Sequence, residues 1–271
     1  MGVGQLAASR PWLSAFDPKA VETCLRAPLT DLITWFNAAA KRRGLRSGNG
    51  HPLVMVEHGE KPSDQAYESF IAQTGCLPTR DNLHDRFNAL IWLHLPGLKA
   101  SLNAGQAEVI AQQGHQTNRR GRFRDWATVL DENGLLVMVD SVDDLAGPWA
   151  QHDWAWLLRT HRQRWLTGAW SVWPIGHALL EKAESLYAGT TGHVWLLEWS
   201  TPSPLSIHMA AWELVDQTAC RALRGQASGL GDQSPGRFYP LPIAGLPDWT
   251  LGNDHDDFYA DRRIFRPPPR G

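Results

Sequence analysis

One segment of the sequence carries polar side chains at a spacing that would place them together on one face of a helix. They fall at i, i+3, i+4 and i+7 and are Asp81, His84, Asp85 and Asn88. A histidine beside a carboxylate can transfer protons or bind a metal, because its pKa lies near neutrality. We expect either a reaction centre in which His84 is the general base oriented by Asp85, or a satisfied polar network or solvated face without a chemical role.

A second polar stripe follows on the next predicted helix. Lys99, Asn103 and Gln106 repeat at helical spacing after a Pro96-Gly97 break. If the two helices form an antiparallel hairpin, the stripes face each other or a shared cavity. In the catalytic interpretation, Lys99 and Arg80 would hold an anionic group of the substrate.

The segment GHALLEK supplies another histidine–carboxylate pair. His177 and Glu181 lie four residues apart and therefore share one helical face. We hypothesise that His177 joins His84 in one site, with Glu181 as the acid and with His193, at the start of a predicted strand, completing the network. The same residues can build a metal site or none, so the identity of any metal or cofactor stays unknown.

A basic segment, GHQTNRRGRFR over residues 114–124, offers a different function. Its four arginines are interleaved with Phe123 and are Arg119, Arg120, Arg122 and Arg124. Guanidinium groups at this density suit RNA or phosphate contacts. We favour the alternative of a solvated loop in which Arg124 pairs with a nearby acid such as Asp125, which makes nucleic acid an unlikely partner.

The composition narrows the class of protein. With 43% hydrophobic and 20% charged residues among 271, the chain can fold into a packed globule. A net charge of −2 gives no general attraction to nucleic acid or anionic lipid. Three scattered cysteines, no secretory signal and no membrane-length apolar run predict a cytoplasmic protein with free thiols and no membrane partner. Fourteen tryptophans predict a tryptophan-rich core or, alternatively, an aromatic-lined groove for a sugar or base.

Periodicity and breaker residues predict a mainly helical α+β protein. Helices are expected over 20–26, 30–43, 63–74, 82–95, 98–112, 151–165, 175–187 and 204–224. Strands are expected over 52–58 and 193–199, and a β-hairpin is expected to join 126–130 to 135–139 through an Asn133-Gly134 turn. We predict a single globular domain over 1–271 with a few short strands and a Pro/Gly-rich extended segment over 225–271.

Four blocks of the sequence carry a resemblance to a known family. They are PTRDNLHDRFNALIWLHLPGLKASLN (Pro78–Asn103), RDWATVLDENG (Arg124–Gly134), GHALLEK (Gly176–Lys182), and LPIAGLPDW followed by FYADRRIFR (Leu241–Arg266). In this order they resemble an uncharacterised proteobacterial family, domain of unknown function 3025. The resemblance implies a bacterial cytosolic protein with one domain over nearly the full length, and it implies no mechanism.

Two classes of function remain open at this point. The first is a small-molecule-binding protein or hydrolase-like enzyme that uses the histidine–carboxylate residues. The second is a non-catalytic adaptor that contacts RNA or phosphate through Arg119–Arg124. The sequence contains none of the common dinucleotide-binding, P-loop, nucleophile-elbow, zinc-protease or EF-hand patterns, so it names no reaction type.

Overall fold

The chain folds into two compact units in a computed structural model that describes residues 10–113, 121–185, 187, 189–199, 209–226 and 235–268. We call Phe16–Val129 with His208–Gly236 the helical unit. Met1–Ala15, Leu130–Ile207 and Arg237–Gly271 make up the sheet unit. The predicted α+β class, mainly helical with a few short strands, is confirmed. The single-domain organisation stays a prediction, and each unit is described by itself.

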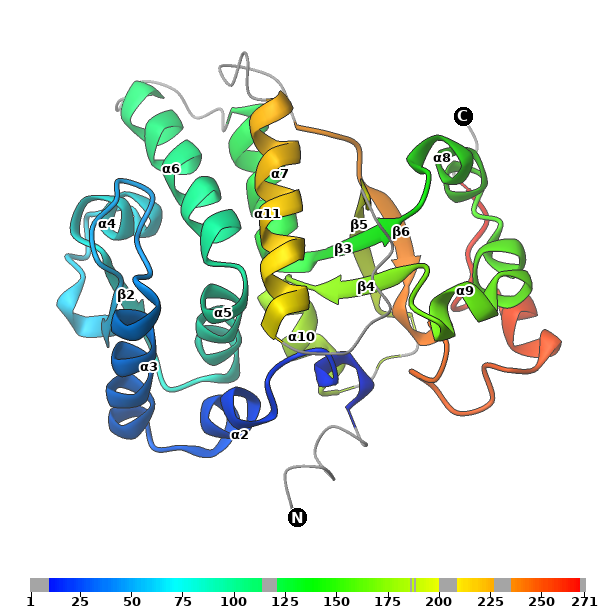
Figure 1. Cartoon of the computed structure of the whole chain (residues 1–271), viewed down its shortest axis with the longest axis horizontal. Coiled ribbons are helices and arrows are strands. Elements are labelled where there is room, and N and C mark those ends of the chain that lie inside the picture. Colours follow the sequence, from blue (N-terminus) through cyan, green and yellow to red (C-terminus); the bar gives the residue numbers. More distant parts are fainter. Residues whose placement is uncertain are drawn as a thin grey trace. The chain divides into compact units, whose positions relative to one another are not determined.

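The helical unit is built mainly from helices (Figure 1). Its described elements are α2 (Pro18–Arg26), α3 (Leu29–Arg43), β1 (Val54–Glu57), η2 (His58–Glu60), α4 (Tyr67–Thr74), β2 (Cys76–Thr79), α5 (Leu83–His94), α6 (Pro96–Gln113), most of α7 (Arg122–Asn133) and α11 (Met209–Gln226). β1 and β2 form a parallel pair in which Val54 is opposite Cys76.

The ends of these helices follow from local chemistry. Gly44 and Gly75 end α3 and α4 in the left-handed conformation, with φ of 64° and 75°, as the sequence predicts. Asn82 caps α5, because its side-chain oxygen accepts the backbone N–H of Asp85 at 2.8 Å. Asp216 of α11 accepts the N–H groups of the first turn of α6 at 2.7 and 2.8 Å, so a carboxylate from another helix stabilises the positive end of α6.

The sheet unit contains a four-stranded sheet in the order β4-β3-β5-β6 (Figure 1). Its described elements are η1 (Pro11–Leu13), the last turn of α7, β3 (Gly134–Val139), α8 (Val142–Ala150), the π-helix η4 (Ala155–Thr160), α9 (Arg162–Leu166), β4 (Ser171–Pro174), α10 (His177–Ala183), β5 (Thr191–Glu198), β6 (Tyr239–Pro242), η5 (Ile243–Gly245) and η6 (Asp256–Ala260). β3 pairs in parallel with β5 and antiparallel with β4.

The central strand β3 explains why the sheet forms where it does. Its residues LLVMV, Leu135 to Val139, are all buried, as expected for a strand that is covered on both faces. Because β3 and β5 are parallel, the chain must cross between their ends, and β4 and α10 lie in this connection. The start of β3 therefore lies beside the turn that leads into α10.

The predicted β-hairpin at Asn133-Gly134 is wrong. Residues 126–130 belong to α7, and β3 begins directly at Gly134, so these two residues form a helix-to-strand junction. The buried residues of α7 repeat at i, i+3, i+4 and i+7 and are Phe123, Trp126, Ala127 and Leu130. This helical spacing outweighs the Asn-Gly turn signal. Gly134 is needed for a different reason, since a Cβ there would lie 2.2 Å from the carbonyl oxygen of Leu130.

Further boundaries differ from the sequence prediction. The helix expected over 151–165 is replaced by the short elements η4 and α9, and α8, which contains Pro148, ends before this range. The helix expected over 175–187 is shorter and spans His177–Ala183. The helix expected from residue 63 begins only at Tyr67. None of the helices in the described ranges is long and apolar enough to cross a membrane.

Candidate functional site

The polar residues at the start of α5 are held by direct ion pairs. Asp85, only 6% exposed, accepts the backbone N–H of Arg80 at 2.7 Å and two guanidinium N–H groups of the same residue at 3.0 Å. The hydrogen bond and the charge of Asp85 raise the pKa of Arg80. The guanidinium group of Arg80 is thus paired with Asp85. A role for Arg80 in holding an anionic ligand stays a prediction.

The two predicted polar stripes do meet between α5 and α6. Lys99 is 5% exposed, donates to Asn88 Oδ1 at 2.8 Å and lies 5.4 Å from the ring centroid of Trp92. Asn88 in turn donates to the hydroxyl of Tyr67 at 3.1 Å. Both contacts of Asn88 have hydrogen-bond length, which is the arrangement of a satisfied buried network.

Asn103 also serves the packing of the helical unit. It is 1% exposed, accepts the N–H of Gly48 at 3.0 Å and donates to the backbone and side-chain oxygens of Glu68 at 2.9 and 2.7 Å. These bonds join α6 to α4 and to the loop before β1. Both N–H donors and the carbonyl oxygen of the side chain thus have partners within the protein.

His177 occupies a different kind of environment in the sheet unit. It is the first residue of α10 and is 4% exposed. Its Nδ1 lies 3.8 Å from an oxygen of Asp131, and its Nε2 lies 3.6 Å from an oxygen of Glu132. Both separations exceed a direct hydrogen bond, so a water or ligand atom that contacts both partners of a pair would do so from the side. The Asp131 side chain is 13% exposed and the Glu132 side chain is 35% exposed, so the Glu132 side is the more open to solvent.

Close backbone packing brings these residues together. The N–H groups of Ile175 and Gly176 both donate to the carbonyl of Gly134, at 3.1 and 2.9 Å. A Cβ on Gly176 would lie 2.5 Å from the nitrogen of Gly134, so only glycine fits at this position. Because Gly176 immediately precedes His177, the imidazole is fixed against the last turn of α7.

Two cationic or titratable side chains lie at the same end of the sheet. Lys182 of α10 donates to Asn133 Oδ1 at 2.8 Å. His193 of β5 is in register with Gly134, the residue after Asn133. Partial removal from water, and then the charge of Lys182, lower the pKa of His193. We call His177, Asp131 and Glu132 the His177 centre; Lys182 and His193 are exposed and lie at the same end of the sheet.

Two further predicted residues are Glu181 and His84. Glu181 is exposed, whereas His177, one turn earlier in the same helix, is buried. His84 belongs to the helical unit and His177 to the sheet unit, and their convergence in one site stays a prediction.

The structure shows that part of the predicted basic loop is helical. Arg119 and Arg120 lie outside the described residues, while Arg122 and Arg124 belong to the first turn of α7. Phe123 is 1% exposed, and a Cβ on Gly105 of α6 would lie 2.4 Å from its ring, so Phe123 is a packing residue. The interpretation of Phe123 as an aromatic group interleaved with arginines in an exposed loop is therefore wrong.

The sequence pattern does not indicate Asp131 and Glu132 as site residues, because the segment DENG resembles a hairpin turn. The helical spacing of the apolar residues before this segment is the signal that could have identified it as the end of a helix. With α7 extended to Asn133, both carboxylates fall in its last turn, where they face the start of α10.

Comparison with known proteins defines the family. The model of the family described as "Protein of unknown function (DUF3025)" matches residues 53–269. No curated protein and no solved structure matches the chain. The matched residues include both the α5–α6 network and the His177 centre. Since the match covers well over half of the sequence, the chain belongs to the DUF3025 family.

Proposed function

We propose that this protein is a small-molecule enzyme of hydrolase-like type, in which His177 is the general base. The observation that carries the proposal is a buried imidazole with each ring nitrogen facing a carboxylate oxygen at a distance longer than a hydrogen bond. A histidine within one water of the proton that it abstracts, and oriented by a third group, is the usual arrangement for proton transfer.

The two carboxylates take different roles in this proposal. Asp131, the less exposed of the pair, faces Nδ1 and stabilises the imidazolium that forms when His177 accepts a proton. Glu132 faces Nε2 on the more exposed side and helps to position a water molecule there. His177 takes one proton from this water, the resulting hydroxide attacks the substrate, and the imidazolium returns the proton to the leaving group.

His84 enters the proposal from the sequence pattern alone. A second histidine beside a carboxylate would assist the same reaction, as the spacing of His84 and Asp85 predicts. If His84 takes part, His84→Asn lowers turnover as strongly as His177→Asn. If turnover in His84→Asn equals that of the wild type, His84 is removed from the proposal and His177 remains.

A cytoplasmic setting is part of the same proposal. Cys24, Cys76 and Cys220 are all free thiols, and two of them are buried. Buried unpaired thiols are typical of proteins from reducing compartments. Alkylation of intact cells with a membrane-impermeant maleimide should leave the protein unlabelled, and labelling would contradict this location.

The enzymatic proposal is tested with two chromogenic substrates of different chemistry. We expect the wild type to turn over 4-nitrophenyl acetate or 4-nitrophenyl phosphate, and His177→Asn to lower kcat by about 100-fold or more, the usual contribution of a general base. His94→Asn is the matched control, because His94 is also buried but packs between Phe16 and Trp212 in the helical unit.

The outcomes are distinct. Loss of turnover in His177→Asn, with turnover retained in folded His94→Asn, supports the proposal. Equal turnover in wild type and His177→Asn, or no turnover of either substrate by the wild type, rejects His177 as a hydrolytic base.

A further inference from the structure

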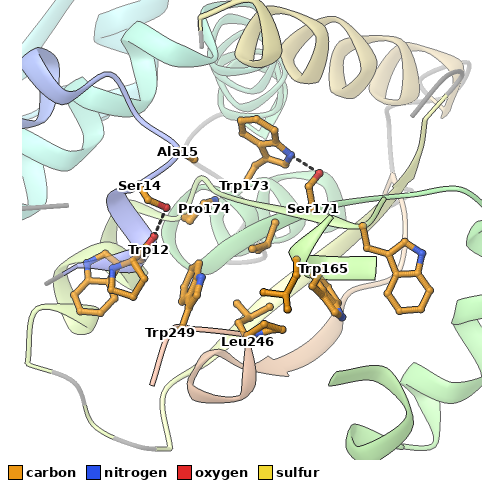
Figure 2. A pocket seen from close by; sticks show the side chains of 14 residues that line it. Trp12, Ser14, Ala15, Trp165, Ser171, Trp173, Pro174, Leu246 and Trp249 are labelled. Atoms are coloured by element: carbon orange, nitrogen blue, oxygen red, sulfur yellow. Dashed lines mark hydrogen bonds between the residues drawn. The ribbon is translucent and has the colours of Figure 1, made fainter. Parts of the chain in front are cut away.

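A pocket lined by tryptophans lies within the sheet unit, formed by residues from its N-terminal segment, its α9–β4 region and the loop after β6 (Figure 2). Five indoles line it: Trp12, Trp165, Trp170, Trp173 and Trp249. Its volume is about 160 Å³. An apolar cavity of about 150 Å³ holds one benzene molecule, so this pocket matches a single six-membered ring.

The polar atoms of the pocket are mostly committed to the protein. Four indole N–H groups already donate to protein oxygens: Trp12 to Glu184, Trp165 to the Leu157 carbonyl, Trp170 to Asp140 and Trp173 to Ser171. Among the described residues, the indole N–H of Trp249 has no acceptor, and the described residues that line the pocket include no charged side chain. A neutral ring with an acceptor for the Trp249 N–H fits this lining.

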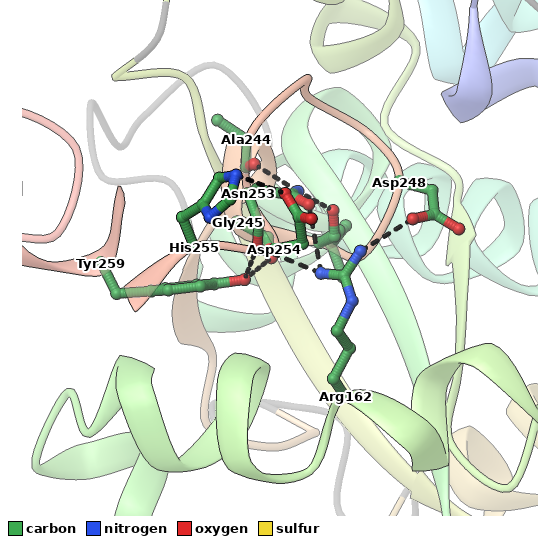
Figure 3. Close-up of polar contacts among 9 residues, drawn as sticks. Arg162, Ala244, Gly245, Asp248, Asn253, Asp254, His255 and Tyr259 are labelled. Carbon is green, nitrogen blue, oxygen red and sulfur yellow. Dashed lines mark hydrogen bonds and ion pairs between the residues drawn. The ribbon is translucent and has the colours of Figure 1, made fainter. Parts of the chain in front are cut away.

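The loop that carries Trp249 is held in a defined conformation (Figure 3). Asn253, 1% exposed, donates to the carbonyls of Ala244 and Leu246 at 3.1 and 2.5 Å. The hydroxyl of Tyr259 donates to the carbonyls of Gly245 and Asn253 at 3.0 and 2.9 Å. These bonds fix both ends of the turn between β6 and η6.

Arg162 of α9 is hydrogen-bonded to the middle of the same loop. It donates to the backbone and side-chain oxygens of Asn253 at 3.1 Å and to Asp248 at 2.7 Å. Asp248, next to Trp249, has a φ of 65°, which is strained for a residue with a side chain. The Asp248 side chain is 72% exposed and is held by Arg162, whose side chain is 13% exposed. A strained residue that is held by a hydrogen bond and adjacent to a pocket residue is consistent with a preorganised binding site.

From the lining, the volume and the one lining indole N–H that has no acceptor among the described residues, we propose that this pocket binds a neutral aromatic ring of about one benzene's size that accepts a hydrogen bond from Trp249. The indoles supply flat apolar faces, which favour offset stacking with another aromatic ring. A sugar fits less well, because its several hydroxyl groups need more polar partners than the lining provides. The site is independent of the His177 centre and of the reaction proposed for it.

The proposal is tested by following the indole N–H signals of ¹⁵N-labelled protein during titration with three ring probes. Pyridine above pH 7 is neutral and has an acceptor, benzene is neutral without one, and N-methylpyridinium has the same shape with a positive charge. Trp249→Phe identifies the Trp249 signal, because that signal is missing from its spectrum. We expect pyridine to shift the Trp249 signal with a Kd on the order of 1 mM, since a ligand of six heavy atoms has limited affinity.

Two variants distinguish the contribution of the Trp249 hydrogen bond to ring binding from the contribution of the cavity itself. Trp249→Phe keeps an aromatic ring and removes the donor, so the preference for pyridine over benzene, about three- to tenfold in the wild type, should disappear. Trp35→Phe, in α3 of the helical unit, is the matched control and should keep the preference. Ala15→Phe fills the pocket from its lining and should abolish binding of both neutral rings.

Three results would overturn the proposal. These are equal binding of pyridine and N-methylpyridinium, an unchanged pyridine preference in Trp249→Phe, and no signal shift with either neutral ring up to its solubility. If Trp249→Phe loses its remaining indole signals and is unfolded, Ala15→Phe decides the question. Ring binding that survives in Ala15→Phe then rejects this pocket as the site.

Discussion

The polar network of the helical unit and the His177 centre of the sheet unit both contain buried polar side chains, but the distances between their polar atoms differ. In the helical unit, Lys99 Nζ of α6 lies 2.8 Å from Asn88 Oδ1 of α5, and Asn88 Nδ2 lies 3.1 Å from the hydroxyl oxygen of Tyr67 in α4. In the sheet unit, the nitrogens of His177 lie 3.6 and 3.8 Å from their carboxylates. The first set is closed by direct hydrogen bonds, and the contacts of His177 with its two carboxylates are longer than hydrogen bonds.

This difference separates structural roles from chemical ones. A closed buried network stabilises one arrangement of helices, and removing one member leaves its partner without a hydrogen bond. Titratable groups whose mutual contacts are longer than hydrogen bonds contribute less to stability, and we propose that those around His177 serve a reaction. We therefore expect changes in the helical unit to affect unfolding and changes at the His177 centre to affect turnover.

The largest expected effect on stability is in the helical unit. Asn103→Ala leaves the N–H of Gly48 and the oxygens of Glu68 without their buried partner. We expect a loss of about 2–4 kcal/mol in the free energy of unfolding, measured by urea denaturation. Gln112→Ala, an exposed change on the same helix, should stay within about 0.5 kcal/mol of the wild type. A loss below 1 kcal/mol in Asn103→Ala would contradict the structural role.

A pH-dependent effect of similar size is expected from His94. Burial lowers its pKa from 6.5 to about 4, with the charge of Arg43 acting in the same direction. The unfolded chain therefore binds a proton more readily than the folded chain, so the stability from neutral His94 is complete above pH 6.5 and falls as pH drops towards 4. The loss amounts to about 3 kcal/mol at most.

His94→Asn tests this pH dependence. The variant should unfold with a smaller change in free energy between pH 6.5 and pH 4 than the wild type, whereas the exposed change His51→Asn should keep the wild-type slope. Identical slopes in the wild type and His94→Asn would show that another group is responsible.

A smaller effect on stability is expected at the His177 centre. Glu132→Gln keeps the size of a side chain that is 35% exposed and removes its charge. The free energy of unfolding should change by less than about 1 kcal/mol, because a partly exposed ion pair contributes little. Turnover of the chromogenic substrates should fall by about 100-fold. The reverse pattern, a large loss of stability with turnover unchanged, would make the contact structural.

The smallest effect concerns the three cysteines, all of which lie in the helical unit. Burial raises the pKa of Cys24 to about 12, and burial followed by the charge of Asp216 raises that of Cys220 to about 12. At pH 8 only the half-buried Cys76 should react rapidly with Ellman's reagent, and all three should react after denaturation. In Asn103→Ala the two slow thiols should react faster, and rates equal to the wild type would argue against opening of the unit.

The sequence predicts those parts of the structure that depend on local signals. Gly44 and Gly75 end helices as expected, because positive φ is readily available to glycine. The contact between Lys99 and Asn88 follows from helical spacing and a short connection between two helices. Such features are encoded within a few turns of chain.

The missed features depend on tertiary contacts. The Asn133-Gly134 sequence resembles a hairpin turn. Burial of Trp126 and Leu130 nevertheless extends α7 to Asn133. This extension places Asp131 and Glu132 opposite His177. The loop that carries Trp249 is held by hydrogen bonds from Arg162, which is far away in sequence. No local periodicity indicates either arrangement.

The most direct test of this contrast is the free energy of unfolding of His177→Asn, measured by urea denaturation beside Asn103→Ala. Both changes alter a buried polar residue of more than 95% burial. If His177 belongs to a reaction centre, His177→Asn loses less than about 2 kcal/mol and clearly less than Asn103→Ala. If His177→Asn loses as much as Asn103→Ala, the His177 centre is a structural network like the one in the helical unit, and the proposed role of His177 is contradicted.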